Sequence, residues 1–233
     1  ADDPCALFGL RPVPGETISN PKTLRLLAQM HKAISIIQFK LEAETIKRRP
    51  EFDMDDRMLL HRIDFERGII TIDGKEYPMK DCNFPTIDPN DPYKLTEEEQ
   101  EIVNKLHRSF VGSEKLRKHI RHIFRNGCMY TVTNSNLLFH ASIPLNEDGS
   151  LREIDIQGKK YKGKALLEKI GHLIRTAYFM EGHSEEKKFA MDYVWYLWCG
   201  KDSPAFDKAK MATFERYFLD DKELHKETKG YYY

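Results

Sequence analysis

The feature that most constrains the fold of this chain is a helical pattern over residues 20–49, with proline at both ends. Asn20 followed by Pro21 predicts a helix start, because asparagine caps free backbone amides and proline fits the first helical position. Pro50 ends the pattern, because proline cannot continue a helix. Such a helix would be about 40 Å long. We therefore expect one long helix that packs across other elements, with a coiled-coil dimer as the weaker alternative.

The apolar side chains within this pattern form a single stripe. They recur at alternating steps of three and four residues, at Leu27, Met30, Ile34, Ile37 and Leu41. Residues with this spacing lie on one face of an α-helix. The sequence therefore predicts that the helix packs through this stripe.

The first half of the chain also predicts a hairpin and loops. Residues 61–79 alternate in polarity and hold Asp73-Gly74 between β-prone runs, which is a hairpin signal. A similar phrase at residues 154–161 predicts a second hairpin. Residues 81–95 are rich in proline and are expected to form a loop, as are the turn-forming residues 1–19.

Two further helices are expected before residue 127. Thr96 and Glu99 have the spacing of a capping box, in which side chains and backbone at a helix start cap each other. Apolar residues follow on one helix face until Gly112 interrupts the pattern. The next helix is expected to end at Asn126-Gly127, since glycine commonly follows the last helical turn.

The spacing of apolar residues changes after Gly127, from a helical pattern to one typical of strands. Residues 128–132 and 136–143 predict two strands joined by a polar turn. The second contains Leu137-Leu138-Phe139, an unbroken apolar run of the kind found in strands that are covered on both faces. Buried strands are therefore expected in the second half of the chain.

Helical patterns dominate the remainder, centred on residues 166–177, 184–199 and 211–218. We divide the chain into a mainly helix-and-hairpin part at residues 1–126 and a part with strands and covering helices at residues 127–233. The mixture of segregated helices and hairpins indicates an α+β fold.

Composition disfavours several functions. The chain has 37 Lys and Arg residues against 37 Asp and Glu, and this zero net charge argues against nucleic acid or anionic membranes as partners. None of the four cysteines forms a CxxC pair, the spacing typical of zinc sites.

No apolar run approaches the ~20 residues of a membrane span and no signal peptide is visible, so we expect a cytoplasmic protein. Both ends look cut: the chain starts at Ala1 and stops on three tyrosines.

His140 is a candidate metal ligand. It ends the apolar strand, and the small Ala141 and Ser142 beside it leave room for an ion or a substrate. A neutral imidazole is a good ligand for Mn, Fe or Zn when a partner orients its second nitrogen. Because metal sites need several ligands, a hydrogen-bonded structural histidine is the simpler alternative from the residues alone.

Basic residues supply the other candidates. Lys201 follows Gly200 in a loop after a tryptophan-rich helix, and Lys208 lies nearby in sequence. A lysine there could contact a phosphate oxygen as a point charge. His119 and His122 share the face of a basic helix that could contact an anion or another subunit. Ordinary solvated surface residues are the alternative in each case. No P-loop, Rossmann, zincin or nucleophile-elbow motif is present.

Several longer phrases are far more specific than these short patterns. They are Ile46-Lys47-Arg48-Arg49-Pro50-Glu51-Phe52, Asn83-Phe84-Pro85-Thr86-Ile87-Asp88-Pro89, Asn136-Leu137-Leu138-Phe139-His140, Ile143-Pro144, Trp195-Tyr196-Leu197-Trp198 and Thr213-Phe214-Glu215-Arg216-Tyr217-Phe218. In these phrases the chain resembles the class III fructose-1,6-bisphosphatases over essentially its whole length.

The resemblance implies a metallophosphoesterase core, an αββα sandwich, with a helix-and-hairpin insertion. Residues 1–126 would then be the insertion and residues 127–233 a part of the core. It also implies hydrolysis of fructose 1,6-bisphosphate to fructose 6-phosphate and phosphate in gluconeogenesis, with manganese or another divalent ion as cofactor. We further expect a homo-oligomer.

Of the metal-ligand positions of this family, only the strand-end histidine maps onto the chain, at His140. Ala141 and Ser142 replace the glycine and cysteine that more usually follow it. The acidic ligand motifs and the last histidine motif lie in parts of the family sequence outside this stretch. Lys201 and Lys208 would contact substrate phosphate. We therefore predict that these residues alone are inactive; a non-catalytic oligomerisation or regulatory module of the enzyme is the alternative.

Overall fold

The computed structural model describes residues 20–232, and the packing divides the chain into two units. The first unit comprises residues up to 103 together with residues 212–226. The second comprises residues 104–211 together with residues 227–233. The chain therefore leaves the first unit, returns to it, and leaves it again.

The sequence predicted a boundary near residue 127, where the spacing of apolar residues changes. The boundary between the two units instead lies inside a helix, between residues 103 and 104. Packing alone does not test whether residues 1–126 are an insertion and residues 127–233 a part of a catalytic core, which stays a prediction. The expected loop at residues 1–19 lies outside the described residues.

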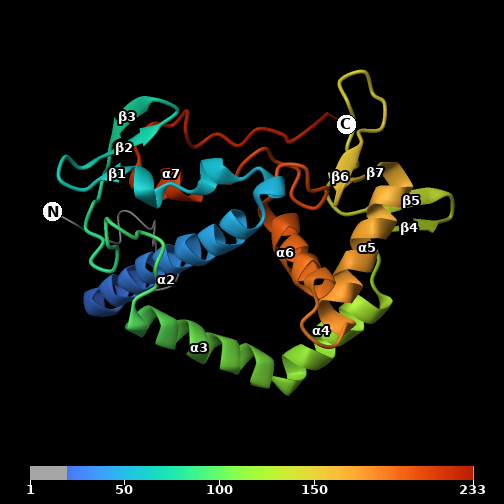
Figure 1. The fold of residues 1–233 in the computed structure, drawn as a ribbon, viewed down its shortest axis with the longest axis horizontal. Coiled ribbons are helices and arrows are strands. Elements are labelled where there is room, and N and C mark those ends of the chain that lie inside the picture. Colours follow the sequence, from blue (N-terminus) through green and yellow to red (C-terminus); the bar gives the residue numbers. More distant parts are fainter. Residues whose placement is uncertain (1–19, 233) are drawn as a thin grey trace. The chain divides into compact units, whose positions relative to one another are not determined.

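The first unit is built on the long helix α2 (Pro21–Arg48), which is blue in Figure 1. The side chain of Asn20 accepts a hydrogen bond from the backbone amide of Lys22 at 3.0 Å, which caps the helix start. At the other end, the backbone N–H of Arg49 donates to carbonyls of the last turn. The predicted long helix and its start and stop signals are confirmed.

Only part of the predicted stripe on α2 is buried. Ile37 is 3% exposed, whereas Leu27, Met30 and Ile34 are 46%, 57% and 41% exposed. The buried face is formed by Ala28, Ile36, Phe39, Ala43 and Ile46. The prediction is therefore wrong for the first half of the helix, because spacing shows which residues share a face and not which face meets the core.

Strands and helix α7 complete the core of the first unit. The 3-10 turns η1 (Pro50–Phe52), η2 (Asp55–Arg57) and η3 (Leu60–Arg62) lead into an antiparallel sheet of β1 (Ile63–Asp64), β2 (Ile69–Ile72) and β3 (Lys75–Pro78). The hairpin predicted around Asp73-Gly74 is confirmed as β2–β3. Helix α7 (Thr213–Phe218) joins this core from far along the chain, with the Phe214 ring 5.7 Å from that of Phe39 (Figure 1).

The capping box is also confirmed. The Thr96 amide donates to the Glu99 carboxylate at 2.9 Å, and the Glu99 amide donates to the Thr96 hydroxyl at 3.2 Å. This pair starts α3 (Glu97–Gly112), and α4 (Glu114–Asn126) follows directly after Ser113.

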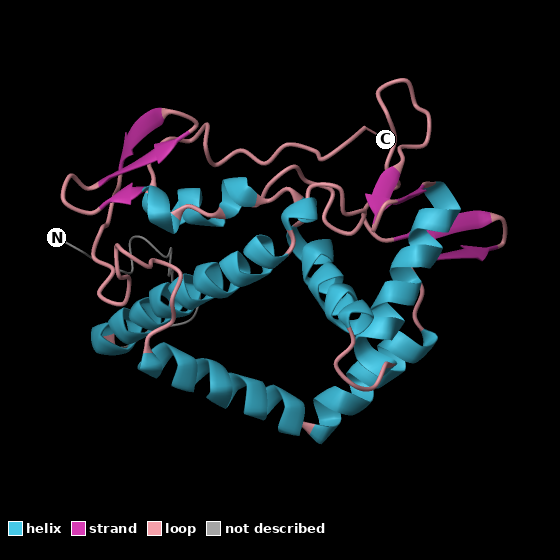
Figure 2. Ribbon diagram, viewed as in Figure 1, coloured by secondary structure: helices cyan, strands magenta, loops and turns pink. Residues whose placement is uncertain are grey.

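In the second unit, α5 (Gly163–Phe179) and α6 (Glu185–Cys199) pack against each other. The buried residues of these helices include Leu166, Ile170, Phe189, Tyr193 and Leu197. Helix α4 contacts α5 through the rings of Phe124 and Tyr178, whose centres are 5.1 Å apart. The hairpin of β6 (Ile154–Ile156) and β7 (Lys159–Tyr161) precedes α5, as predicted (Figure 2).

The hairpin of β4 (Tyr130–Thr133) and β5 (Asn136–Phe139) is present, but it is not covered on both faces. Leu137, Leu138 and Phe139 are 46%, 54% and 41% exposed. The expectation of a strand buried on both faces is therefore wrong within residues 20–232. An apolar run is compatible with burial, but it does not supply the second layer that would cover it.

Helices and small antiparallel sheets together give the α+β class that was predicted. Within residues 20–232, none of the helices has the length and apolar character that crossing a bilayer requires.

Candidate functional site

His140 lies in a bend immediately after β5, and it is exposed. Its carbonyl accepts a hydrogen bond from the backbone amide of Ser142 at 2.9 Å, which closes a three-residue turn. The central residue, Ala141, has a φ of +56°. A left-handed conformation of this kind costs a residue with a side chain roughly 1–2 kcal/mol. A glycine at this position would adopt it freely.

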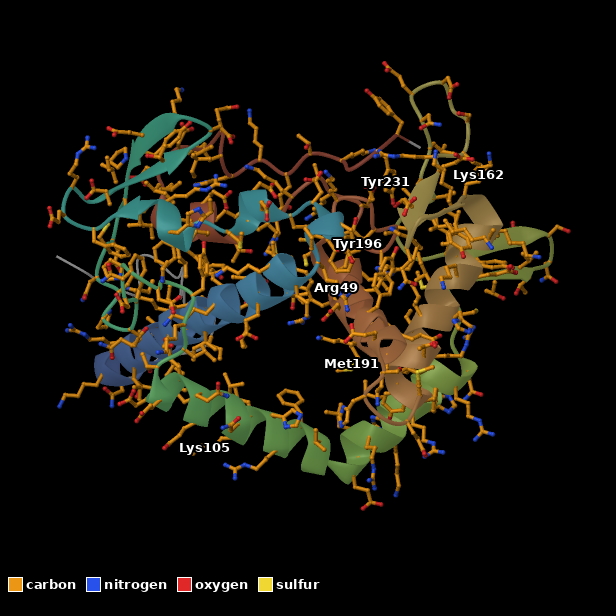
Figure 3. All side chains as sticks on the ribbon, in the orientation of Figure 1. Arg49, Lys105, Lys162, Met191, Tyr196 and Tyr231 are labelled. Carbon is orange, nitrogen blue, oxygen red and sulfur yellow. The ribbon has the colours of Figure 1, made fainter. Side chains whose placement is uncertain are left out.

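Ser142 fastens this turn to two other segments. It is 2% exposed, and its backbone N–H donates to the carbonyl of Pro204 at 3.2 Å. Its hydroxyl lies 2.9 Å from the hydroxyl of Tyr231, which donates to the carbonyl of Ser203 at 3.2 Å. The end of β5, the loop after α6 and the C-terminal segment that carries Tyr231 (Figure 3) are thus joined by buried hydrogen bonds.

Lys201 stands in the first turn of the loop after α6, directly after Gly200. The loop is held by Ser203, a fully buried residue whose hydroxyl donates to the carbonyl of Leu197 at 2.7 Å. Asp202 forms an ion pair with the guanidinium of Arg152, with 2.8 Å between the nearest oxygen and nitrogen. The backbone that carries Lys201 is therefore fixed by its own neighbours.

Lys208 is engaged by an acidic residue. Its ammonium forms an ion pair with the carboxylate of Glu227, whose side chain is 12% exposed. The same ammonium lies 5.8 Å from the centre of the Phe206 ring. A substrate phosphate at Lys208 would have to compete with this carboxylate.

The structure thus brings together the backbone segments that carry His140 and Lys201, through the contact of Ser142 with Pro204. The roles of these side chains as metal ligand and phosphate contact stay predictions. The other histidine pair is elsewhere in the second unit: His122 lies on α4 with its Nδ1 3.1 Å from the side-chain amide of Asn126.

The donor set gives a direct test of whether a metal ion fits. Among residues 20–232, no group of three or more His, Cys, Asp and Glu side chains is placed to hold a metal ion. His140 could supply one imidazole to manganese or another divalent ion. Because protein metal sites use several ligands, His140 alone is not a metal site.

Comparison with known sequences decides the family. The sequence model for the Firmicute fructose-1,6-bisphosphatases matches residues 1–233, which is the whole chain. The chain belongs to this family.

Curated relatives agree with this assignment. The chain is 72% identical over 234 residues to a class 3 fructose-1,6-bisphosphatase of Phocaeicola vulgatus. It is 65% identical over 233 residues to one of Bacteroides fragilis and 52% identical over 232 residues to one of Clostridium novyi. Each match covers 100% of this chain but 35% of the relative, so the chain spans about a third of the length of these fructose-1,6-bisphosphatases. No solved structure matches significantly.

For this member of the Firmicute fructose-1,6-bisphosphatase family, sequence patterns missed the hydrogen bonds around His140. Ser142 and Tyr231 are 89 positions apart, and no local spacing relates them. The signals that were available are the small residue beside His140 and the aromatic run at the end. Tyr231 is 4% exposed, whereas Tyr232 is 58% exposed.

The buried Tyr231 hydroxyl predicts a pH effect on stability. Burial raises the pKa of Tyr231 to about 12 from an ordinary value of 10.0. Because the folded chain holds this proton more tightly than the unfolded chain, the stabilisation is complete below pH 10.0 and is lost as the pH rises towards about 12. We expect Tyr231→Phe to flatten the alkaline fall in the free energy of unfolding, measured by urea denaturation at stepped pH.

Tyr232→Phe is the matched control, since its side chain is exposed and it should keep the slope of the unmodified chain. An alkaline slope that is the same in Tyr231→Phe would show that this hydroxyl does not titrate as described.

Proposed function

We propose that this chain is a segment of a fructose-1,6-bisphosphatase, which hydrolyses fructose 1,6-bisphosphate to fructose 6-phosphate and phosphate in gluconeogenesis. The observation that carries the proposal is the family match along the whole chain. Relatives that are named for this activity reach 72% identity over the same residues. We place the complete enzyme in the cytoplasm.

We further propose that residues 127–233 contribute to a metallophosphoesterase sandwich. The support is the exposed hairpin β4–β5, whose apolar Leu137, Leu138 and Phe139 are uncovered within residues 20–232. Segments of a longer chain would supply the layer that covers them.

His140 would hold one divalent ion in the complete enzyme, with manganese as the expected metal. Such an ion, when bound, polarises phosphoryl oxygens and lowers the pKa of a bound water. The chain's own contribution is positional. The hydrogen bonds of Ser142 hold the turn that carries His140 against the loop that carries Lys201. The backbone positions of His140 and Lys201 are therefore fixed relative to each other. The Lys201 ammonium would attract the substrate phosphate, with Lys208 as the weaker candidate.

The chain by itself is expected to be inactive, because one imidazole does not hold a metal ion that can generate hydroxide. The measurement compares phosphate release from fructose 1,6-bisphosphate, with and without Mn²⁺, for the full-length protein and for the 233-residue chain. We expect metal-dependent release by the full-length protein and none by the chain.

Fructose 6-phosphate serves as the control substrate and should release no phosphate. A full-length protein that does not hydrolyse fructose 1,6-bisphosphate would refute the proposed activity, and metal-dependent release by the isolated chain would refute the segment assignment.

A second candidate function is a non-catalytic oligomerisation or regulatory module, and one observation supports it. Large apolar side chains are exposed on two helices: Leu27, Met30 and Ile34 on α2, and Leu106 and Phe110 on α3. Contiguous exposed apolar surface is typical of faces that are covered in an assembly. An enzyme that changes oligomer size without losing turnover when these residues are made polar would support this candidate.

A further inference from the structure

A cleft of about 360 Å³ lies in the first unit, between α2 and the loop that precedes α3. On α2 it is lined by Arg25, Gln29, Lys32 and Ala33, which recur at helical spacing and therefore share one face. Its opposite wall includes Asn83 and Pro85. This volume lies within the range of pockets that bind small molecules.

Internal contacts hold the base of the cleft in place. The ammonium of Lys32 pairs with the carboxylate of Asp81, donates to the carbonyl of Asn83 at 2.6 Å and lies 4.9 Å from the centre of the Phe84 ring. Asp81 and Phe84 are 7% and 6% exposed. The loop is thus tied to the helix without any ligand, and the positive charge of Lys32 is already balanced by Asp81.

Arg25 and Gln29 differ from Lys32 in this respect. Both side chains are exposed, and neither side chain makes a hydrogen bond or an ion pair with any residue in the range 20–232. The side-chain amide of Asn83, on the opposite wall, likewise makes no hydrogen bond there. The cleft therefore has one unbalanced cation and two amides that can bind a ligand, beside the small apolar surfaces of Ala33 and Pro85.

We propose that this cleft binds a small organic oxyanion, a phosphate or a carboxylate attached to an apolar body. The planar guanidinium of Arg25 would bind the anionic group through paired N–H donors, a geometry that suits both kinds of oxyanion. Gln29 and Asn83 would bind polar groups of the ligand, and Ala33 and Pro85 would contact its apolar body. None of these residues is among His140, Lys201 and Lys208, so the inference does not depend on the proposed catalytic function.

The test uses the 233-residue chain and measures binding of phenyl phosphate and benzoate by NMR titration of backbone amides. We expect saturable shifts at Arg25, Gln29 and Asn83 for at least one of the two anions. The tighter probe identifies the preferred anionic group. Phenol lacks the anion and inorganic phosphate lacks the apolar body, so both should bind more weakly.

Variants connect the binding to the cleft. Arg25→Ala removes the cation and should weaken binding at least tenfold, about the effect of one charge-assisted hydrogen bond. Ala33→Glu places a negative charge at an exposed position in the cleft. This charge would repel the anionic probe, so saturable binding should be lost. Arg48→Ala, on the same helix but outside the cleft, is the matched control and should bind as the unmodified chain does.

Three results would overturn the proposal. They are the absence of saturable binding by both anions, an affinity for phenol equal to that for phenyl phosphate, and an equal loss of binding in Arg25→Ala and Arg48→Ala. The last result would mean that the probes respond only to the net charge of the chain.

Discussion

Replacement of Lys40 by methionine is expected to lower the free energy of unfolding by about 3–5 kcal/mol, because it leaves a buried carboxylate without its partner. Lys40 is fully buried, and its ammonium lies 2.7 Å from the carboxylate of Glu99 and 2.6 Å from the carbonyl of Thr86. Glu99 is 5% exposed and also caps the start of α3, so its carboxylate has little freedom to turn towards water. Urea denaturation followed by circular dichroism measures the loss.

Two further variants separate the charge effect from lost packing. The double variant Lys40→Met with Glu99→Gln removes both charges and should lose less stability than Lys40→Met alone. Lys118→Met disrupts an exposed pair with Glu114 at 2.8 Å and should leave stability nearly unchanged, because surface ion pairs contribute little. If Lys40→Met were as mild as Lys118→Met, the buried pair would not hold α2 to the start of α3.

In the full-length enzyme, His140→Ala is expected to lower kcat/KM for fructose 1,6-bisphosphate by at least about 100-fold. Loss of residues that merely orient metal ligands already lowers affinity or activity by roughly 10- to 100-fold, and a ligand itself should matter more. Steady-state phosphate release at a series of Mn²⁺ concentrations measures the effect. A higher metal requirement should accompany the lower rate, with unchanged oligomer size.

His183→Ala is the control, because this residue is an exposed histidine in the same unit and belongs to none of the candidate sites. Full activity in His140→Ala at every metal concentration would remove this residue from the metal site. A loss of activity together with a smaller molecular size in solution would instead favour a role in assembly.

Local signals in the sequence predicted the helix ends and hairpins well. Asn20 before Pro21 and the pairing of Thr96 with Glu99 act over a few residues, and the structure shows the expected hydrogen bonds at both places. Asp73-Gly74 likewise has a turn conformation, with φ of +51° and +76°. These features depend on backbone capping and turn geometry, which a short stretch of sequence determines.

Features that depend on distant partners were not predictable in the same way. The spacing of Leu27 and Ile34 indicated one helix face, but partners elsewhere in the chain decided that another face is buried. The contact of Ser142 with Tyr231 and the ion pair of Lys208 with Glu227 each join separate segments. The metal role of His140 rests on family resemblance, because a single histidine has no spacing that identifies a metal site.

The return of α7 to the first unit has a consequence for how the protein is made. Phe214, Phe218 and Leu219 pack in the same core as Phe39 and Ile70, so this core is incomplete until the ribosome has passed residue 219. At ordinary rates of translation the earlier apolar side chains wait for seconds with part of their contacts missing. The nascent chain should therefore recruit chaperones during this interval, and a product that ends at residue 103 should aggregate instead of folding.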